Sequence, residues 1–256
     1  MTNLVRNLKE DVIKSGLTTE IEVSNMLRQD NWIVINQYPY IDERVEKIRT
    51  LDVLATKALK GGKSCTLFVE CKKATDHQWI FYTPPLTGMD LFLRVMDNLT
   101  RQIERQHIPE QNHRATAPFF SVHPPDLSTS RIGLISYIPF SKKDDFNEAR
   151  NQILSAIESR RLTASERSVV YPVIVFDGDL YELDVAGDDI ELTTASYLTF
   201  LSSMITDLTP ILIDITTLRH FPSYVDMLNK ELGPARSPSE AIEAIQELIE
   251  RLSGKQ

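Results

Sequence analysis

A carboxylate and an ammonium group stand two positions apart at the end of an apolar segment. Residues 65–69 are mainly apolar, β-branched or aromatic, which predicts a strand that continues into Glu70 and Lys72. Because side chains alternate across a strand, Glu70 and Lys72 share one face and Lys73 points to the other. The pair could act on a charged substrate. A plain salt bridge at a strand end is the alternative interpretation, although burying one without purpose is costly.

A second carboxylate, Asp52, interrupts the apolar run of residues 49–56, which predicts another strand. The two glycines at 61–62 turn the chain between these strands, so we expect antiparallel neighbours that bring Asp52 close to Glu70. Two converging carboxylates form a hard oxygen site suited to Mg²⁺. A lysine beside such a site could hold the attacking water or stabilise developing negative charge.

A third carboxylate, Glu20, lies on the apolar face of a predicted helix at 18–30. Seven residues of helix return to within about 20° of the starting direction, so Glu20 shares the face of Leu27, whereas Glu22 faces solvent. Thr19 and Glu22 match a capping box at the start of this helix. The alternative is that Glu20 simply occupies the first turn, where acidic residues are favourable.

These residues, in this order and on these types of element, resemble the PD-(D/E)xK nuclease superfamily, whose members have the restriction-endonuclease-like fold. The residues that carry the resemblance are Glu20, Asp52 within Leu-Asp-Val-Leu-Ala, and Glu70-Cys71-Lys72. It covers roughly residues 16–138, and its first half is similar to archaeal Holliday-junction resolvases. Leu51 stands where the family often has proline, a position that varies widely in the superfamily.

The resemblance implies a Mg²⁺-dependent endonuclease, with Mn²⁺ able to substitute, that hydrolyses DNA phosphodiester bonds in restriction, phage defence or repair. RNA is an alternative substrate. By the resemblance, Asp52, Glu70 and the carbonyl group of Cys71 bind the metal, Lys72 orients or activates the water, and Glu20 joins through the metal or a water. The competing hypothesis is a catalytically inactive module of the same fold that binds nucleic acid or a protein partner.

The order of the predicted elements favours an α/β fold with three layers, in which a central mixed sheet is flanked by helices. We expect a single domain over residues 1–256, with a nuclease core at about 16–138 and a C-terminal α/β extension at about 139–256 packed on the same sheet. The further expected elements are strands at 32–38, 132–138 and 211–215, an irregular segment at 74–88, a loop at 109–130, helices at 89–106, 144–160, 221–232 and 238–252, and a hairpin of 169–176 with 180–185 around Asp177-Gly178.

The composition is that of an ordinary globular protein, with 42% hydrophobic and 25% charged residues in 256. No apolar run approaches the roughly 20 residues of a membrane span, and the N-terminus lacks the pattern of a signal peptide. The chain has only two cysteines, Cys65 and Cys71, both on one predicted strand, which favours the reducing cytoplasm.

The net charge of −8 is unevenly distributed. Residues 1–73 hold 12 basic and 10 acidic side chains, whereas residues 141–256 hold 11 and 20. A protein that binds nucleic acid by charge alone is usually basic, so this chain would need a local patch or a metal. This counts against a non-specific DNA coat and does not exclude a nuclease.

Other polar residues near the motif are weaker candidates for contact with a substrate. They are Arg49, Lys73, His77 and Gln78, for which surface charge or a plain loop is the alternative. Asp214, inside an apolar strand, has no role in this interpretation. No glycine-rich phosphate loop or nucleophile elbow supports a small-molecule α/β enzyme. The sequence leaves the oligomeric state open, with a homodimer as one alternative.

Overall fold

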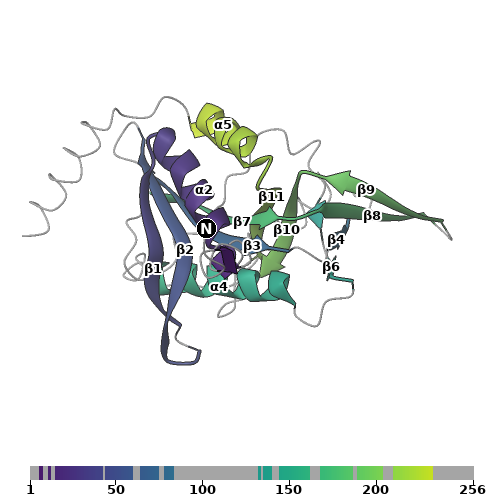
Figure 1. Cartoon of the computed structure of the whole chain (residues 1–256), viewed down its shortest axis with the longest axis horizontal. Helices are drawn as coiled ribbons and strands as arrows, with labels where there is room; N and C mark the ends of the chain where they lie inside the picture. Colours follow the sequence, from purple (N-terminus) through teal and green to yellow (C-terminus); the bar gives the residue numbers. More distant parts are fainter. Residues whose placement is uncertain are drawn as a thin grey trace, which may run out of the picture.

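The computed structural model of the chain describes residues 6–7, 11–12, 15–42, 44–59, 64–74, 78–83, 132–133, 135–139, 144–161, 168–186, 189–203 and 210–232 (Figure 1). His77, the predicted helices at 89–106 and 238–252 and the predicted loop at 109–130 lie outside the described residues.

Within these residues, seven strands form one mixed sheet in the order β1-β2-β3-β7-β11-β10-β5. Their bounds are β1 Ile33–Asp42, β2 Lys47–Ala58, β3 Ser64–Lys73, β5 Ile132–Gly133, β7 Ser168–Asp177, β10 Tyr197–Ser203 and β11 Pro210–Thr217. The pairs β1–β2, β2–β3 and β10–β11 are antiparallel, whereas β3, β7 and β11 run parallel to one another. The predicted antiparallel pairing of the strands that carry Asp52 and Glu70 is therefore confirmed.

A smaller sheet of four strands has the order β6-β4-β8-β9. Its strands are β4 Trp79–Tyr82, β6 Ile135–Tyr137, β8 Leu180–Ala186 and β9 Asp189–Ala195. The ribbon of β8 and β9 extends away from the large sheet (Figure 1).

Helices cover both faces of the large sheet, which confirms the expected α/β layering (Figure 1). Helix α4, Asp145–Arg161, covers one face, and helices α2, Leu17–Gln29, and α5, Phe221–Leu232, cover the other. Because side chains alternate along a strand, a single strand can contribute apolar residues to the cores on both faces of the sheet. Phe68 packs on the α4 side, and its neighbours Leu67 and Val69 pack on the α2 and α5 side.

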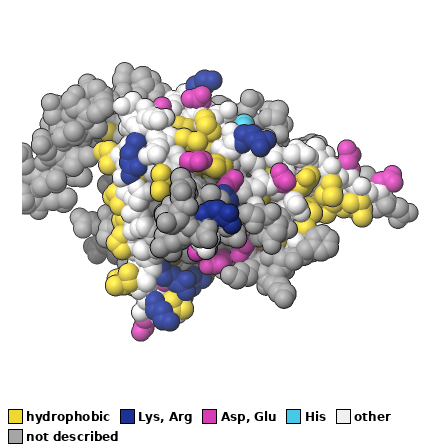
Figure 2. All heavy atoms as spheres, viewed as in Figure 1, with side chains coloured by type: hydrophobic (Ala, Val, Ile, Leu, Met, Phe, Trp, Pro, Cys, Tyr) yellow, Lys and Arg dark blue, Asp and Glu magenta, His cyan; other side chains and the backbone are white. Residues whose placement is uncertain are grey.

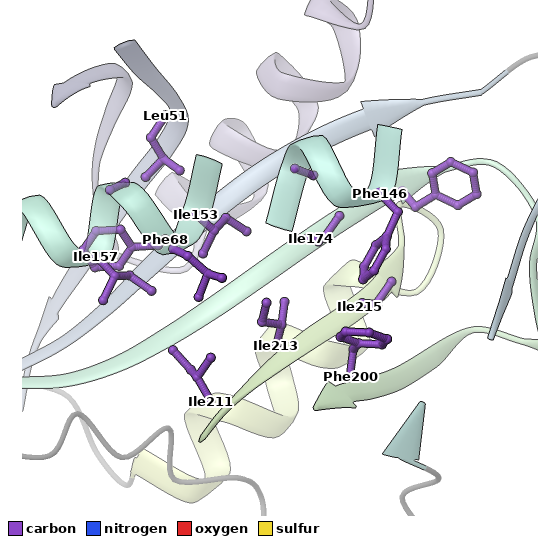
Figure 3. Packing of buried hydrophobic residues seen from close by; sticks show 14 of the residues in the cluster. Leu51, Phe68, Phe146, Ile153, Ile157, Ile174, Phe200, Ile211, Ile213 and Ile215 are labelled. Carbon is purple, nitrogen blue, oxygen red and sulfur yellow. The ribbon is translucent and has the colours of Figure 1, made fainter. Parts of the chain in front are cut away.

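The core on the α4 side is built from aliphatic and aromatic side chains of segments that are far apart in the sequence. In Figure 3, Ile153 and Ile157 of α4 gather with Phe68 of β3 and Ile174 of β7. Full burial of each such side chain contributes about 1.5–3 kcal/mol relative to leaving it exposed. This core holds α4 against the strand that carries Glu70 and Lys72.

The predicted hairpin around Asp177-Gly178 is wrong. Strand β7 already has β3 on one side and β11 on the other, so no edge of β7 is left for β8. After the turn, β8 leaves the large sheet and pairs with β4 and β9. The local turn signal was correct, but the pairing is decided by strands far away in the sequence.

Two further predictions of strands need correction. The segment at 74–88, expected to be irregular, contains β4 at Trp79–Tyr82. The expected strand at 132–138 is divided between β5, which pairs with β10 in the large sheet, and β6, which pairs with β4 in the small one.

The predicted capping box at the start of α2 is also wrong. The helix begins after Gly16, whose φ of 80° is in the left-handed region that favours glycine, and the first helical N–H, of Leu17, donates to the Ser15 hydroxyl at 3.4 Å. The Thr19 hydroxyl instead donates to the Asp177 carboxylate at 3.2 Å. The tertiary contact thus displaces the local cap.

Strand β1 forms one end of the large sheet and, among the described strands, pairs with β2 alone. Its backbone is irregular in the middle, because Gln37 has a φ of 49° and Pro39 has no N–H group. Among the described residues, no helix is long and apolar enough to cross a membrane.

Candidate active site

Asp52 and Glu70 lie where strands β2 and β3 separate. The last residue pair between these strands is Val53 with Val69. Asp52 comes directly before Val53 and Glu70 directly after Val69, so both lie just beyond the end of the pairing. The backbone N–H of Cys71 donates to the Asp52 Oδ2 atom at 2.8 Å. This hydrogen bond holds the Asp52 carboxylate against the end of β3.

Glu70 is a fully buried carboxylate beside Asp52 and Lys72. Its side chain is 0% exposed, and the described residues place no donor in good hydrogen-bond geometry on Oε1 or Oε2. The nearest cation is Lys72, whose Nζ atom lies 3.7 Å from Oε2. Burial and then the charge of Asp52 raise the pKa of Glu70 well above its ordinary value, and Lys72 opposes this. Buried polar groups are nearly always partnered, so these oxygens need an explanation.

Lys72 is held from the other side by helix α4. Its Nζ atom donates to the Gln152 Oε1 atom at 3.1 Å, and the side chain remains 20% exposed. No sequence motif identifies Gln152, because it lies 80 positions further along the chain and meets Lys72 through tertiary packing. Alternation along β3 did predict that Lys72 and Glu70 share a face.

Glu20 approaches the same place from α2. The Gln37 Nε2 atom donates to the Glu20 Oε2 atom at 2.7 Å, and the side chain is half-buried. Burial and then Asp52 raise the pKa of Glu20, whereas Gln37 and Lys72 lower it. Glu22, two residues later, is exposed. The two acids therefore face different surroundings, as the helical spacing predicts.

The electrostatics of the site show an excess of negative charge. Burial is also the largest cause that raises the pKa of Asp52, and the Cys71 N–H and Lys72 lower it. The Cys71 thiol is buried, and burial followed by Asp52, Glu70 and Glu20 raises its pKa. Three carboxylates thus lie near one lysine in a largely buried place, and this excess of negative charge favours a positively charged ligand.

The weaker candidates lie elsewhere or are engaged. Arg49 pairs with the buried Asp42 at 3.0 Å, and Lys73 pairs with Asp177 at 2.9 Å. Gln78 is partly exposed directly before β4. The structure therefore groups Glu20, Asp52, Glu70 and Lys72, and it gives Arg49 and Lys73 partners outside that group.

The donor set fits a hard divalent cation. In the described part of the chain, no three His, Cys, Asp or Glu side chains form a complete ligand group. Mg²⁺ does not need one, because it usually keeps several waters and binds through one or two carboxylates. Asp52 and the buried oxygens of Glu70 meet that requirement.

No protein-family model, curated protein or solved structure matches this chain.

Proposed function

We propose that this chain is a Mg²⁺-dependent endonuclease that hydrolyses DNA phosphodiester bonds, with a restriction-endonuclease-like core. The observation that carries the proposal is the fully buried carboxylate of Glu70, which lies beside Asp52 and, among the described residues, has one long ion pair, to Lys72, and no donor in good hydrogen-bond geometry. A charge buried in this way destabilises the fold unless it has a function or a ligand. A divalent cation would supply the missing partner.

Asp52, Glu70 and the carbonyl group of Cys71 would hold the ion. When bound, Mg²⁺ supplies Lewis acidity for phosphodiester hydrolysis, and Mn²⁺ has the same preference for oxygen ligands. The Cys71 N–H keeps the Asp52 carboxylate in place at 2.8 Å, so this ligand is positioned before the ion arrives.

Lys72 supplies the positive charge that the reaction needs on the protein side. Its side chain is partly exposed and so could reach a phosphate oxygen or a water molecule, while Gln152 orients the ammonium group. A preorganised cation stabilises the negative charge that develops in phosphoryl transfer. Glu20, at the half-buried rim, can accept a hydrogen bond from the attacking water.

The layering supports the same proposal. The two strands that carry Asp52 and Glu70 are antiparallel neighbours, α2 brings Glu20 from one face, and α4 brings Gln152 from the other. Elements from both faces thus converge where β2 and β3 separate.

The test is Mg²⁺-dependent cleavage of plasmid DNA and of labelled single strands by the full chain. Glu70→Gln and Lys72→Ala are each expected to lower the rate at least about 100-fold, roughly 2.7 kcal/mol of transition-state stabilisation. Lys72→Arg is also expected to fail, because a guanidinium group is neither compact nor able to release its proton. Asp226→Asn, an exposed change on α5, serves as the matched control.

Wild-type cleavage by both Glu70→Gln and Lys72→Ala would refute the proposal. If the wild-type chain binds DNA in Mg²⁺ but never cleaves it, the inactive binding module replaces the nuclease.

A further inference from the structure

A cavity of about 440 Å³ lies close to the candidate active site but is separate from it. It opens at the carboxyl ends of β7 and β11, between α2 and the first turn of α5. Because β3 runs parallel to β7, the carboxyl end of β3, with Glu70 and Lys72, lies at the same edge of the sheet. In open α/β sheets, ligands bind in crevices at this edge.

Two elements link the cavity to the active site, because Lys72 and Lys73 of β3 pair in register with Phe176 and Asp177, which line the cavity. Lys73, next to Lys72, pairs through Nζ with the Asp177 Oδ2 atom at 2.9 Å, and Asp177 lines the cavity. Thr19, next to Glu20, donates to the same carboxylate oxygen at 3.2 Å. The start of α2 and the end of β3 therefore connect the two places through neighbouring residues.

The lining is rich in hydrogen-bond acceptors. Glu22 from α2 and Asp179 from the turn before β8 are exposed there, whereas the carboxylate of Asp177 is engaged by Lys73 and Thr19. Arg219 is the only cation that lines the described cavity. Such a lining disfavours a phosphate group and favours a neutral ligand that donates N–H groups.

Apolar groups complete the cavity. Met26, Leu180 and Pro222 contribute to its walls. Leu180 is fully buried, so the accessible apolar surface comes from Met26 and Pro222, and methionine sulfur makes favourable contacts with aromatic rings. The volume falls within the range of small-ligand pockets, roughly 300–1,000 Å³.

We propose that this cavity binds one unpaired guanine base of the nucleic-acid substrate, next to the position of cleavage. The inference rests on the proposed nuclease function. Guanine presents two parallel N–H donors, at N1 and N2, which match the two oxygens of a carboxylate. Adenine and cytosine present one amino group each and thymine a single ring N–H. Unstacked bases are commonly recognised in this way, by hydrogen bonds to the exposed edge and packing on the ring face.

The experiment measures binding without catalysis. Fluorescence anisotropy of the full chain, in EDTA, compares short labelled thymine strands that carry one central guanine, adenine or inosine. Guanine is expected to bind at least tenfold more tightly than adenine, with inosine, which lacks the N2 amino group, in between. Asp179→Asn and Glu22→Gln should each reduce the preference for guanine at least fivefold, and Asp226→Asn on the outer side of α5 should keep it.

Equal affinity for guanine and adenine in the wild-type chain would overturn the inference, as would a preference that survives both Asp179→Asn and Glu22→Gln. Because both side chains are exposed, thermal unfolding of the two variants should match that of the wild type. The two proposals fail differently. A chain that prefers guanine but never cleaves refutes the nuclease alone, and a chain that cleaves without preference refutes the guanine site alone.

Discussion

Glu70 affects stability and the proposed activity in opposite directions. Its carboxylate is fully buried, the described residues place no donor in good hydrogen-bond geometry on either oxygen, and the ion pair to Lys72 is long at 3.7 Å. Replacing a buried charged group by a neutral group of the same shape removes the desolvation penalty, whereas it also removes the ligand. The side chain should therefore be unfavourable for folding and necessary for activity.

These opposite effects predict how stability depends on pH. Burial and Asp52 raise the pKa of Glu70 in the folded state, so its contribution to stability is complete below the ordinary value of 4.5 and is lost as pH rises through the folded pKa. In EDTA, Glu70→Gln should be more stable than the wild type by about 1–3 kcal/mol at pH 8, with a smaller gap at pH 4.5.

The measurement is urea unfolding at both pH values. Adding Mg²⁺ should stabilise the wild type and leave the variant unchanged, because the ion binds only the intact carboxylate pair. A gap that does not change with pH would contradict the assigned pKa shift.

Glu20 is expected to matter for the rate of cleavage. It lies near Asp52 and Lys72 and is held by Gln37 at 2.7 Å. Glu20→Gln should lower the cleavage rate at least about tenfold, roughly 1.4 kcal/mol of transition-state stabilisation. Glu191→Gln, an exposed change on β9, provides the control. The measurement is single-turnover cleavage in Mg²⁺, and equal rates for the two variants would remove Glu20 from the site.

At the scale of elements, Asp214 joins three of them through one buried carboxylate. Its Oδ1 atom accepts hydrogen bonds from Tyr197 at 3.0 Å and Thr199 at 3.1 Å on β10, and its Oδ2 atom accepts one from Tyr224 on α5 at 2.8 Å. These bonds explain an acidic residue inside the apolar strand β11. They favour a structural role over a second active site.

Loss of this carboxylate should destabilise the fold strongly. Asp214→Ala leaves three hydroxyl donors without this acceptor, so we expect a loss of about 3 kcal/mol or more in the free energy of unfolding, against about 1 kcal/mol for Tyr224→Phe. Urea unfolding of both variants gives the two values. A loss below about 1 kcal/mol for Asp214→Ala would show that the network contributes little.

The elements that the sequence predicted well are those with strong local patterns. Helices α2, α4 and α5 and the strands that carry Asp52 and Glu70 are at the expected places, because their apolar periodicity matches their burial. The pairing of β7 and β8 was wrong, because two distant strands occupy both edges of β7. Pairing of this kind depends on the whole sheet, which a local turn signal does not describe.

The same limit applies to the candidate site. Alternation predicted a common face for Glu70 and Lys72, and helical spacing distinguished Glu20 from Glu22. The partners that orient these residues, Gln37 and Gln152 among them, come from other elements and carry no motif. Residue type and spacing were enough to identify the charged residues of the candidate site. Their neutral hydrogen-bond partners could be identified only from the tertiary structure.

The whole molecule has two ribbons that reach beyond the helical layers, β1–β2 and β8–β9 (Figure 1). Both expose aliphatic side chains, which Figure 2 shows as hydrophobic surface at opposite ends of the view. The most exposed are Ile41 at 58% and Ile48 at 78% on the first ribbon and Ile190 at 70% on the second. Ile41 and Ile48 lie directly opposite each other on β1 and β2, and Ile190 lies opposite Val185 on β8.

The irregular middle of β1 bears on whether separate molecules remain apart in solution. A long outer strand with exposed isoleucines is a template for intermolecular β-pairing and fibre growth. Pro39 cannot donate to an incoming strand, and the positive φ of Gln37 breaks the flat ladder two residues earlier.

Pro39→Thr restores a donor, so we expect faster aggregation on agitation, followed by light scattering and thioflavin fluorescence. Thr50→Val, on the partner strand, is the control, and equal lag times would show that the proline has no protective role. Strand β1 contributes Gln37 to the candidate active site and stays at the outer side of the sheet, and its irregular backbone should keep it from pairing with a strand of another molecule.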